Sequence, residues 1–131
     1  MARSALPHIF SVLGITRRTH PQGSGNFTYT NPGSKSLRTF IWDDAGIDER
    51  GYLVLVEEEL TGLVPLHVEG HIARVKVMLT RGESIARVVW VLRERDFQKM
   101  IDLLRFYAVN LSPLPPMEIW SDSGVRLGSM P

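Results

Sequence analysis

The chain has 131 residues, of which 44% are hydrophobic and 22% are charged, as expected of one ordinary globular domain. It contains no cysteine, which excludes disulfide scaffolds, cysteine-based zinc sites and cysteine nucleophiles. No apolar run approaches the roughly 20 residues that a membrane-spanning helix needs, and the N-terminus lacks a signal-peptide pattern, so we expect a chain that is neither inserted nor secreted.

The net charge of +1 hides a strong segregation of charge along the sequence. Residues 1–42 carry five basic side chains and no acidic one, whereas residues 43–69 carry eight acidic side chains against one arginine. The remaining residues are basic overall. Such an arrangement favours self-association or contact with an anionic surface through one face, unless the charges neutralise each other within the fold.

The N-terminal third lacks a clear periodic pattern. Residues 5–15 are apolar with Pro7 near their start, and they permit a strand, a helical turn or an arm that docks on a neighbouring subunit. Residues 16–36 predict a long loop, because proline and glycine recur through them. Phe27 and Tyr29 lie between its basic residues, a composition suited to phosphates or lipid headgroups unless the two rings pack back on the core.

The next segment combines strand signals with an acidic run. Residues 37–42 predict a strand, residues 43–46 a turn, and residues 52–56 a strand buried on both faces. Three glutamates follow at positions 57–59. Because adjacent carboxylates are expensive to bury, we expect this run to emerge into solvent or to meet a basic partner. An irregular connection is expected over residues 60–68.

The clearest pattern begins at residue 70. Residues 71–80 alternate between apolar and polar side chains, which predicts a half-buried strand, and Gly82 permits a hairpin turn to a second strand over residues 85–92. From Phe97 to Leu111 the apolar residues recur at helical spacing, with Asp96 as the expected N-cap. We expect this helix to pack on the hairpin.

These elements predict a single α+β domain, in which a mainly antiparallel sheet is covered by one principal amphipathic helix at about residues 95–111. Residues 117–120 are expected to form a last strand or to cover an edge. The predicted organisation is a basic, loop-rich N-terminal segment (1–36), an α+β core (37–120) and a polar, partly disordered C-terminal tail (121–131).

One stretch contains catalytic residue types at regular spacing, namely His67, Glu69 and His71. In a strand these three side chains would share one face and offer a metal two imidazoles and a carboxylate. Gly70 weakens a strand here and no fourth ligand follows, so ordinary surface residues are the alternative. The sequence has no phosphate-binding glycine loop, nucleophile elbow or zinc-protease helix. We therefore predict a protein that is not an enzyme and that uses no metal or other cofactor.

Basic side chains on the non-core faces of the two predicted strands would form a small cationic patch. Such a patch gains around 1 kcal/mol per basic residue near an anionic membrane surface, and it suits phosphate backbones as well. The alternative is an ordinary half-exposed sheet with basic residues facing solvent. The predicted binding residues for membrane or nucleic acid are Arg17, Arg18, Lys35, Arg38, Arg74, Lys76, Arg87 and Arg93.

The second half of the chain also carries a resemblance. Gly70-His71 precedes the alternating stretch, Glu83-Ser84 forms the turn, and the segment from Val89 to Arg93 contains Trp90 ahead of a helix and a proline-containing tail. This order resembles the C-terminal part of the matrix proteins of non-segmented negative-strand RNA viruses, and most of all the small matrix proteins of the bornavirus-like group.

The resemblance implies a homo-oligomer that assembles beneath the viral envelope. It would bind the anionic lipids of the inner membrane leaflet and the viral ribonucleoprotein or RNA, and it would be found in the virion, in the host cytoplasm and at the inner face of host membranes. The leading hypothesis is therefore a matrix protein, and the rival is a small nucleic-acid-binding protein without a membrane role.

Overall fold

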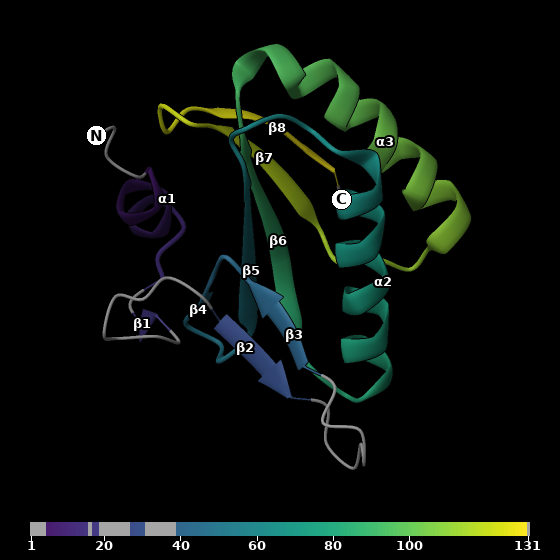
Figure 1. Cartoon of the computed structure of the whole chain (residues 1–131). Helices are drawn as coiled ribbons and strands as arrows, with labels where there is room; N and C mark the ends of the chain where they lie inside the picture. The colour runs from purple at the N-terminus through teal and green to yellow at the C-terminus, as the bar shows by residue number, and fades with distance from the viewer. Residues whose placement is uncertain (1–4, 16, 19–26, 31–38, 131) are drawn as a thin grey trace.

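The computed structural model describes residues 5–15, 17–18, 27–30 and 39–130, with the backbone alone for residues 17, 18, 27, 28, 30 and 39. Within these residues the chain forms three α-helices, one short 3-10 helix and eight strands (Figure 1). In chain order they are α1 (Leu6–Val12), β1 (Arg17–Arg18), β2 (Phe27–Thr30), β3 (Thr39–Trp42), β4 (Asp44–Ile47), β5 (Leu53–Glu59), α2 (Pro65–Thr80), β6 (Ile85–Leu92), η1 (Glu94–Asp96), α3 (Phe97–Leu111), β7 (Met117–Ser121) and β8 (Arg126–Met130).

The main sheet has six strands in the order β1-β4-β5-β6-β7-β8, and β2 and β3 form a separate two-stranded ribbon. β6 lies parallel to both of its neighbours, β5 and β7. The other four pairings, including β2 with β3, are antiparallel. The predicted single α+β domain with a mostly antiparallel sheet is therefore confirmed, and the parallel pairings are confined to the centre of the main sheet.

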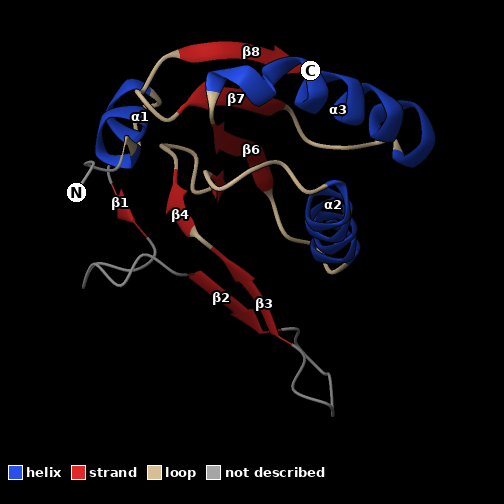
Figure 2. Ribbon diagram, turned by 45° about the horizontal axis from the view of Figure 1, so that its top comes forward, coloured by secondary structure: helices blue, strands red, loops and turns tan. Residues whose placement is uncertain are grey.

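Parallel neighbours require crossover connections, and α2 and α3 provide them. Both helices pack on one face of the sheet, where Ile72 of α2 and Leu104 of α3 join Leu55 and Val88 in one apolar core. α1 covers the opposite face, against the alternate side chains of β5, β6 and β7. Figure 2 shows the three layers that result, with the β2–β3 ribbon projecting from the sheet.

The predicted strand over residues 71–80 is wrong, because these residues form the C-terminal part of α2. The side chains that α2 buries are Val68, Ile72, Val75 and Met78, whose spacing of three to four residues is helical. Apolar residues at every second position also satisfied a strand pattern, and that ambiguity misled the prediction. The expected hairpin is therefore a strand–helix–strand unit in which β6 runs parallel to β5.

Other expectations had mixed outcomes. The strand over residues 85–92 and the helix over residues 97–111 are confirmed. Residues 117–120 form a strand, β7, but it is neither the last strand nor at the edge, because β8 follows it and pairs with it. Asp96 occupies the N-cap position, but its side chain makes no capping hydrogen bond. The predicted turn over residues 43–46 is wrong because β4 lies there. Residues 121–131 were predicted to be a partly disordered tail, but they contain β8.

The structure also tests part of what was predicted for the N-terminal residues. Of the three alternatives for residues 5–15, the helical one is observed as α1. β1 and β2 lie inside the predicted loop, whose other residues lie outside the described part of the chain. The expected irregular connection is shorter than predicted, since α2 begins at Pro65. α2 is also a second long helix beside the one that was predicted.

Two glycines provide a matched test of the assignment of residues 65–80 to a helix, α2. Gly82 has a φ of +92° with nothing near its missing Cβ, so we expect Gly82→Ala to lower the free energy of unfolding by about 1–2 kcal/mol through backbone strain alone. Gly70 lies inside α2, and its Cβ would lie 3.6 Å from Nη1 of Arg74, an ordinary contact. Gly70→Ala should therefore stabilise the protein by about 0.5–1 kcal/mol. Urea unfolding followed by circular dichroism measures both, and a loss from Gly70→Ala would contradict the helix.

Candidate functional site

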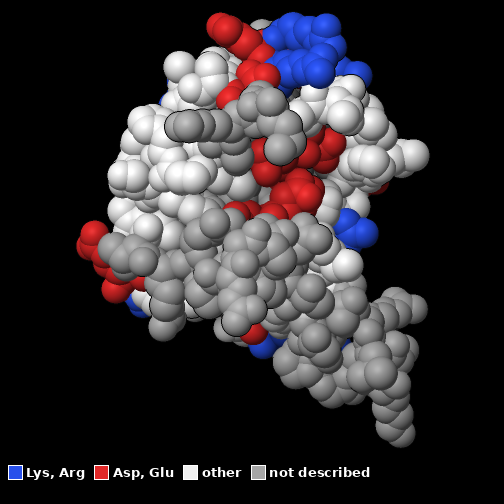
Figure 3. All heavy atoms as spheres, turned by 60° about the vertical axis from the view of Figure 1, so that its left-hand side comes forward, with Lys and Arg blue, Asp and Glu red and all other residues white. Residues whose placement is uncertain are grey.

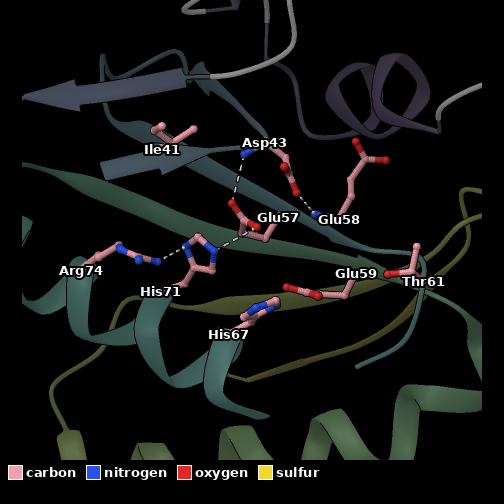
Figure 4. A pocket seen from close by; sticks show the side chains of 9 residues that line it. All are labelled: Ile41, Asp43, Glu57, Glu58, Glu59, Thr61, His67, His71 and Arg74. Atoms are coloured by element: carbon pink, nitrogen blue, oxygen red, sulfur yellow. Dashed lines mark hydrogen bonds and ion pairs between the residues drawn. The ribbon is translucent and has the colours of Figure 1, made fainter. Parts of the chain in front are cut away.

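A pocket opens where β3 and β4 part from each other. The chain bends at Asp43, after which β4 pairs with β5 in the main sheet, whereas β3 pairs with β2 in the ribbon. The opening lies at the carboxyl end of β5, the edge at which ligands bind in sheets with parallel strands. We call this cavity of about 550 Å³ the acid–histidine pocket; it is lined by Ile41, Asp43, Glu57, Glu58, Glu59, Thr61, His67, His71 and Arg74 (Figure 4).

The periodicities of two elements bring the polar side chains together. On β5, Glu57 and Glu59 are two residues apart and therefore point to the same face of the sheet. On α2, His67, His71 and Arg74 are spaced by four and three residues and so share one side of the helix. The helix lays this side against the end of β5, which produces two carboxylates facing two imidazoles.

Glu57 is buried but well supplied with hydrogen bonds. His71 Nε2 lies 3.1 Å from one carboxylate oxygen of Glu57, and the backbone N–H of Asp43 donates to the other at 3.0 Å. The Asp43 carboxylate in turn accepts from the backbone N–H of Glu58 at 2.7 Å. The acidic run thus meets a basic partner at Glu57, which was one of the two expected outcomes, while β5 continues through all three glutamates.

Glu59 differs from Glu57 in the hydrogen bonding of its carboxylate. It is 8% exposed, and its carboxylate accepts no hydrogen bond from the part of the chain that the structure describes. Figure 4 shows the carboxylate turned into the pocket beside His67. The residue as a whole is largely covered, but its carboxylate opens into the pocket without a donor from the described residues, so it is placed to contact a ligand there.

The pocket has an excess of negative charge. Four carboxylates and one guanidinium line the pocket, which leaves three negative charges when both imidazoles are neutral. Burial raises the pKa of the carboxyl groups of Glu57, Glu58 and Glu59, and the nearby Asp43 raises each pKa further. Acidic side chains also gather in a band on one face of the molecule (Figure 3), in keeping with the acidic stretch over residues 43–69. A cation would relieve this repulsion.

Among the described residues, no three carboxylate or imidazole groups are placed to hold a metal ion by themselves. This finding argues against a closed structural metal site of the zinc type, in which the protein supplies all the ligands. It is compatible with Mg²⁺ or Mn²⁺, because Mg²⁺ usually keeps several waters and takes one or two carboxylates plus the phosphate of a substrate. The arrangement thus favours a hydrated cation with open coordination positions.

The raised pKa values predict how stability depends on pH. Since the folded protein holds protons on these glutamates more strongly than the unfolded chain, their contribution to stability is full below about pH 4.5 and is lost as the pH rises through the raised values. The free energy of unfolding should therefore fall over that window. Urea unfolding at a series of pH values measures the slope, which Glu58→Gln should reduce; an unchanged slope in this variant would contradict the assignment.

The structure separates the candidate constellation of His67, Glu69 and His71 that the sequence analysis weighed. The two histidines line the pocket, but Glu69 is exposed and is not among the lining residues, because two residues along a helix do not share a face. Sequence reasoning missed Asp43, Glu57 and Glu59 as partners of the histidines. The helical spacing of His67, His71 and Arg74 was the available signal.

The predicted cationic patch is wrong as a single surface. Arg74 lines the acid–histidine pocket, and Lys76 of the same helix donates to the carbonyl of Pro113 at 3.1 Å. Arg87 lies on the opposite face of the sheet, where it forms an ion pair with the buried Glu118. Arg93 is exposed just after β6.

The N-terminal basic residues are less fully placed. Arg17 and Arg18 form β1, of which the backbone alone is described, and Lys35 and Arg38 lie outside the described residues. Among the described residues no helix has the length and apolar character needed to cross a membrane. Comparison with protein-family models, with curated proteins and with solved structures finds no match to this chain. The resemblance to viral matrix proteins therefore stays a prediction.

Proposed function

We propose that the chain is a divalent-cation-dependent phosphoesterase whose active site is the acid–histidine pocket. The observation that carries the proposal is the Glu59 carboxylate, which accepts no hydrogen bond within the described residues and points into a cavity with an excess of negative charge (Figure 4). Oxygen ligands of this kind suit Mg²⁺ or Mn²⁺. Glu57 and Glu59, two residues apart on β5, are the ligands that we assign to the cation.

Arg74 supports a phosphate-bearing substrate. Its guanidinium forms no ion pair with a carboxylate in the described part of the chain, although the pocket is acidic. One of its N–H groups contacts His71, and the planar group keeps further donors for the pocket. Guanidinium groups bind phosphate oxygens in a bidentate manner, so Arg74 would hold the phosphate of the substrate.

The chemistry that follows is hydrolysis of a phosphate ester. A cation held by Glu57 and Glu59 would supply Lewis-acid chemistry, lowering the pKa of a water and polarising the phosphoryl group. The water attacks phosphorus and gives up a proton to an imidazole of the pocket, the ester P–O bond breaks, and the proton passes to the departing alkoxide. The cavity volume of about 550 Å³ lies within the range of small-molecule sites, roughly 300–1,000 Å³.

The first test is a hydrolysis screen with the full chain. Bis(4-nitrophenyl) phosphate, single-stranded RNA and duplex DNA would each be incubated with Mg²⁺, with Mn²⁺ and with EDTA. The proposal expects turnover that requires the cation and that stops on replacement of Glu59 by glutamine. Isothermal titration of Mn²⁺ into the metal-free protein provides the second readout. Neither turnover nor stoichiometric cation binding would overturn the proposal.

A matrix layer on anionic membranes is our second proposal, and one feature of α3 favours it. Phe106 is 60% exposed and Val109 is 83% exposed, and the exposed Arg105 lies beside them on the same helix. Exposed apolar side chains next to a basic one suit a membrane surface or a second copy of the chain. Liposome flotation across a salt series tests this proposal. It expects binding that needs anionic lipid and weakens in Val109→Glu; absence of binding at low salt would contradict it.

A further inference from the structure

We propose that the two imidazoles of the acid–histidine pocket have separate roles: His71 is a positioning residue that holds Glu57, and His67 is the residue that transfers a proton. The part that concerns His67 rests on the proposed phosphoesterase function. The part that concerns His71 rests on hydrogen-bond geometry alone, and it holds or fails independently of catalysis.

Both ring nitrogens of His71 are engaged. Nδ1 lies 3.3 Å from Nη1 of Arg74, and Nε2 lies 3.1 Å from the carboxylate of Glu57. A guanidinium can only donate, so Nδ1 must be the accepting nitrogen. The ring proton then resides on Nε2, which donates it to Glu57. Arg74 therefore selects one tautomer of His71, and that tautomer presents an N–H to Glu57.

The surroundings of His71 restrict its ring to this orientation. Trp42 packs against the ring with centroids 4.7 Å apart, and Trp90 meets it edge-on at 6.3 Å. The His71 side chain is only 12% exposed. The ring packs between two indoles and both of its nitrogens make polar contacts, so neither nitrogen is available to a cation or a substrate. It orients a carboxylate instead, as partners of metal ligands do.

His67 has the opposite environment. It lies one helical turn nearer the start of α2 and is exposed, and neither ring nitrogen makes a hydrogen bond within the described residues. The Glu59 carboxylate is close enough to interact with it electrostatically. A solvent-accessible imidazole beside a carboxylate that can hold the cation is suited to take the proton from the attacking water.

Nuclear magnetic resonance tests the positioning role directly. Long-range ¹H–¹⁵N correlation spectra distinguish a bare ring nitrogen from a protonated one. For His71 of the metal-free protein we expect a bare Nδ1 and a protonated Nε2, whereas no contact within the described residues selects one ring nitrogen of His67 over the other. Arg74→Gln should alter the His71 pattern and leave that of His67 unchanged. A protonated Nδ1 on His71 would overturn the assignment.

Matched substitutions separate positioning from proton transfer. The amide of glutamine places an N–H near the position of Nε2, whereas the shorter asparagine does not reach it. We expect His71→Asn to weaken Mn²⁺ binding by about 10–100-fold and His71→Gln to retain most of the affinity. His67→Gln should leave the Mn²⁺ affinity within about threefold of the parent and lower kcat by about 100-fold or more.

The outcomes distinguish the two proposals from each other. Equal Mn²⁺ affinity in His71→Asn and His71→Gln, with the predicted tautomer absent, would overturn the positioning role even if the protein hydrolyses phosphate esters. Full kcat in His67→Gln would overturn its catalytic role. If no cation binds to the parent protein, the proposed function fails, yet the ring tautomer of His71 remains measurable.

Discussion

Replacement of Glu59 by glutamine is expected to remove cation binding while leaving the fold intact or more stable. Loss of a partner of a metal ligand costs 10–100-fold in affinity, so loss of a ligand should weaken Mn²⁺ binding by more than about 100-fold. The same change removes a partly buried carboxylate whose pKa is raised by burial, a group that destabilises the metal-free protein at neutral pH. Function and stability should therefore move in opposite directions.

Because cation binding and stability are expected to change in opposite directions in Glu59→Gln, measuring both separates loss of a ligand from loss of the fold. Isothermal titration measures the affinity for Mn²⁺, and thermal unfolding without metal measures stability at neutral pH. A variant that loses cation binding because it unfolds would lower both quantities. Glu69→Gln is the matched control, because it changes the same chemical group on an exposed side chain of α2 outside the pocket. Loss of binding in Glu69→Gln but not in Glu59→Gln would contradict the assignment of Glu59 as a ligand and would favour the candidate cluster of His67, Glu69 and His71 that the sequence analysis weighed.

Binding of the cation should also be visible as a gain of stability that depends on pH. A ligand that binds the folded state alone stabilises it by about 2.7 kcal/mol at a concentration 100-fold above its Kd. The carboxylates must lose their protons before they can coordinate, so the gain should be larger at pH 8 than at pH 5. This trend opposes the loss of stability with rising pH that we expect for the metal-free protein.

The elements that the sequence predicted correctly are those with one strong local signal. Residues 85–92 are an uninterrupted apolar run apart from Arg87, which suits a central strand buried on both faces. Residues 97–111 have a single apolar stripe that ends before a proline. In each case the residues that the local pattern marks as apolar are the ones that the fold buries, so local pattern and tertiary packing favour the same element.

α2 shows why the remainder of the fold was not predictable. Its sequence places apolar residues at 73, 75, 77 and 79, yet of these only Val75 is fully buried, and Val77 is 39% exposed. The helix is selected by a long-range requirement, since a strand parallel to β5 needs a crossover between the two. No local pattern specifies that β5 and β6 run in the same direction.

The site depends on the same long-range choice. With residues 71–80 as a strand, His71 and Arg74 would project to opposite faces and Glu57 would have no imidazole opposite it. As a helix, they join His67 on one side and meet the end of β5. The acidic run, which was expected either to emerge into solvent or to meet a basic partner, lines a cavity because α2 packs beside the end of β5.

The largest effect on stability is expected at Trp42. This residue ends β3 just before the bend at Asp43, and its ring contacts His71 of the acid–histidine pocket. Its side chain is fully buried in the core on the α2 face and packs on the His71 ring. Trp42→Ala should lower the free energy of unfolding by about 3–5 kcal/mol, because it removes a large apolar contact and leaves a cavity. Such a loss is a large fraction of the 5–15 kcal/mol by which domains are typically stable.

Trp42→Phe separates packing from polarity at the same position. The indole Nε1 of Trp42 is buried and has no hydrogen-bond partner within the described residues. Phenylalanine keeps most of the ring and removes this unsatisfied donor, so the two effects should offset each other to within about 1 kcal/mol. Urea unfolding followed by far-ultraviolet circular dichroism measures all variants. Phe106→Ala, at a side chain that is 60% exposed, should change stability by no more than about 0.5 kcal/mol.

The Trp42 variants also connect the core to the site. If the indole wall keeps the His71 ring in place, the partly filled cavity of Trp42→Ala should weaken Mn²⁺ binding even under conditions where the variant remains folded, whereas Trp42→Phe should retain the parent affinity. A folded Trp42→Ala protein with unchanged affinity would show that the two hydrogen bonds of His71 suffice to orient it. Packing and hydrogen bonding would then be separable contributions to the geometry of Glu57.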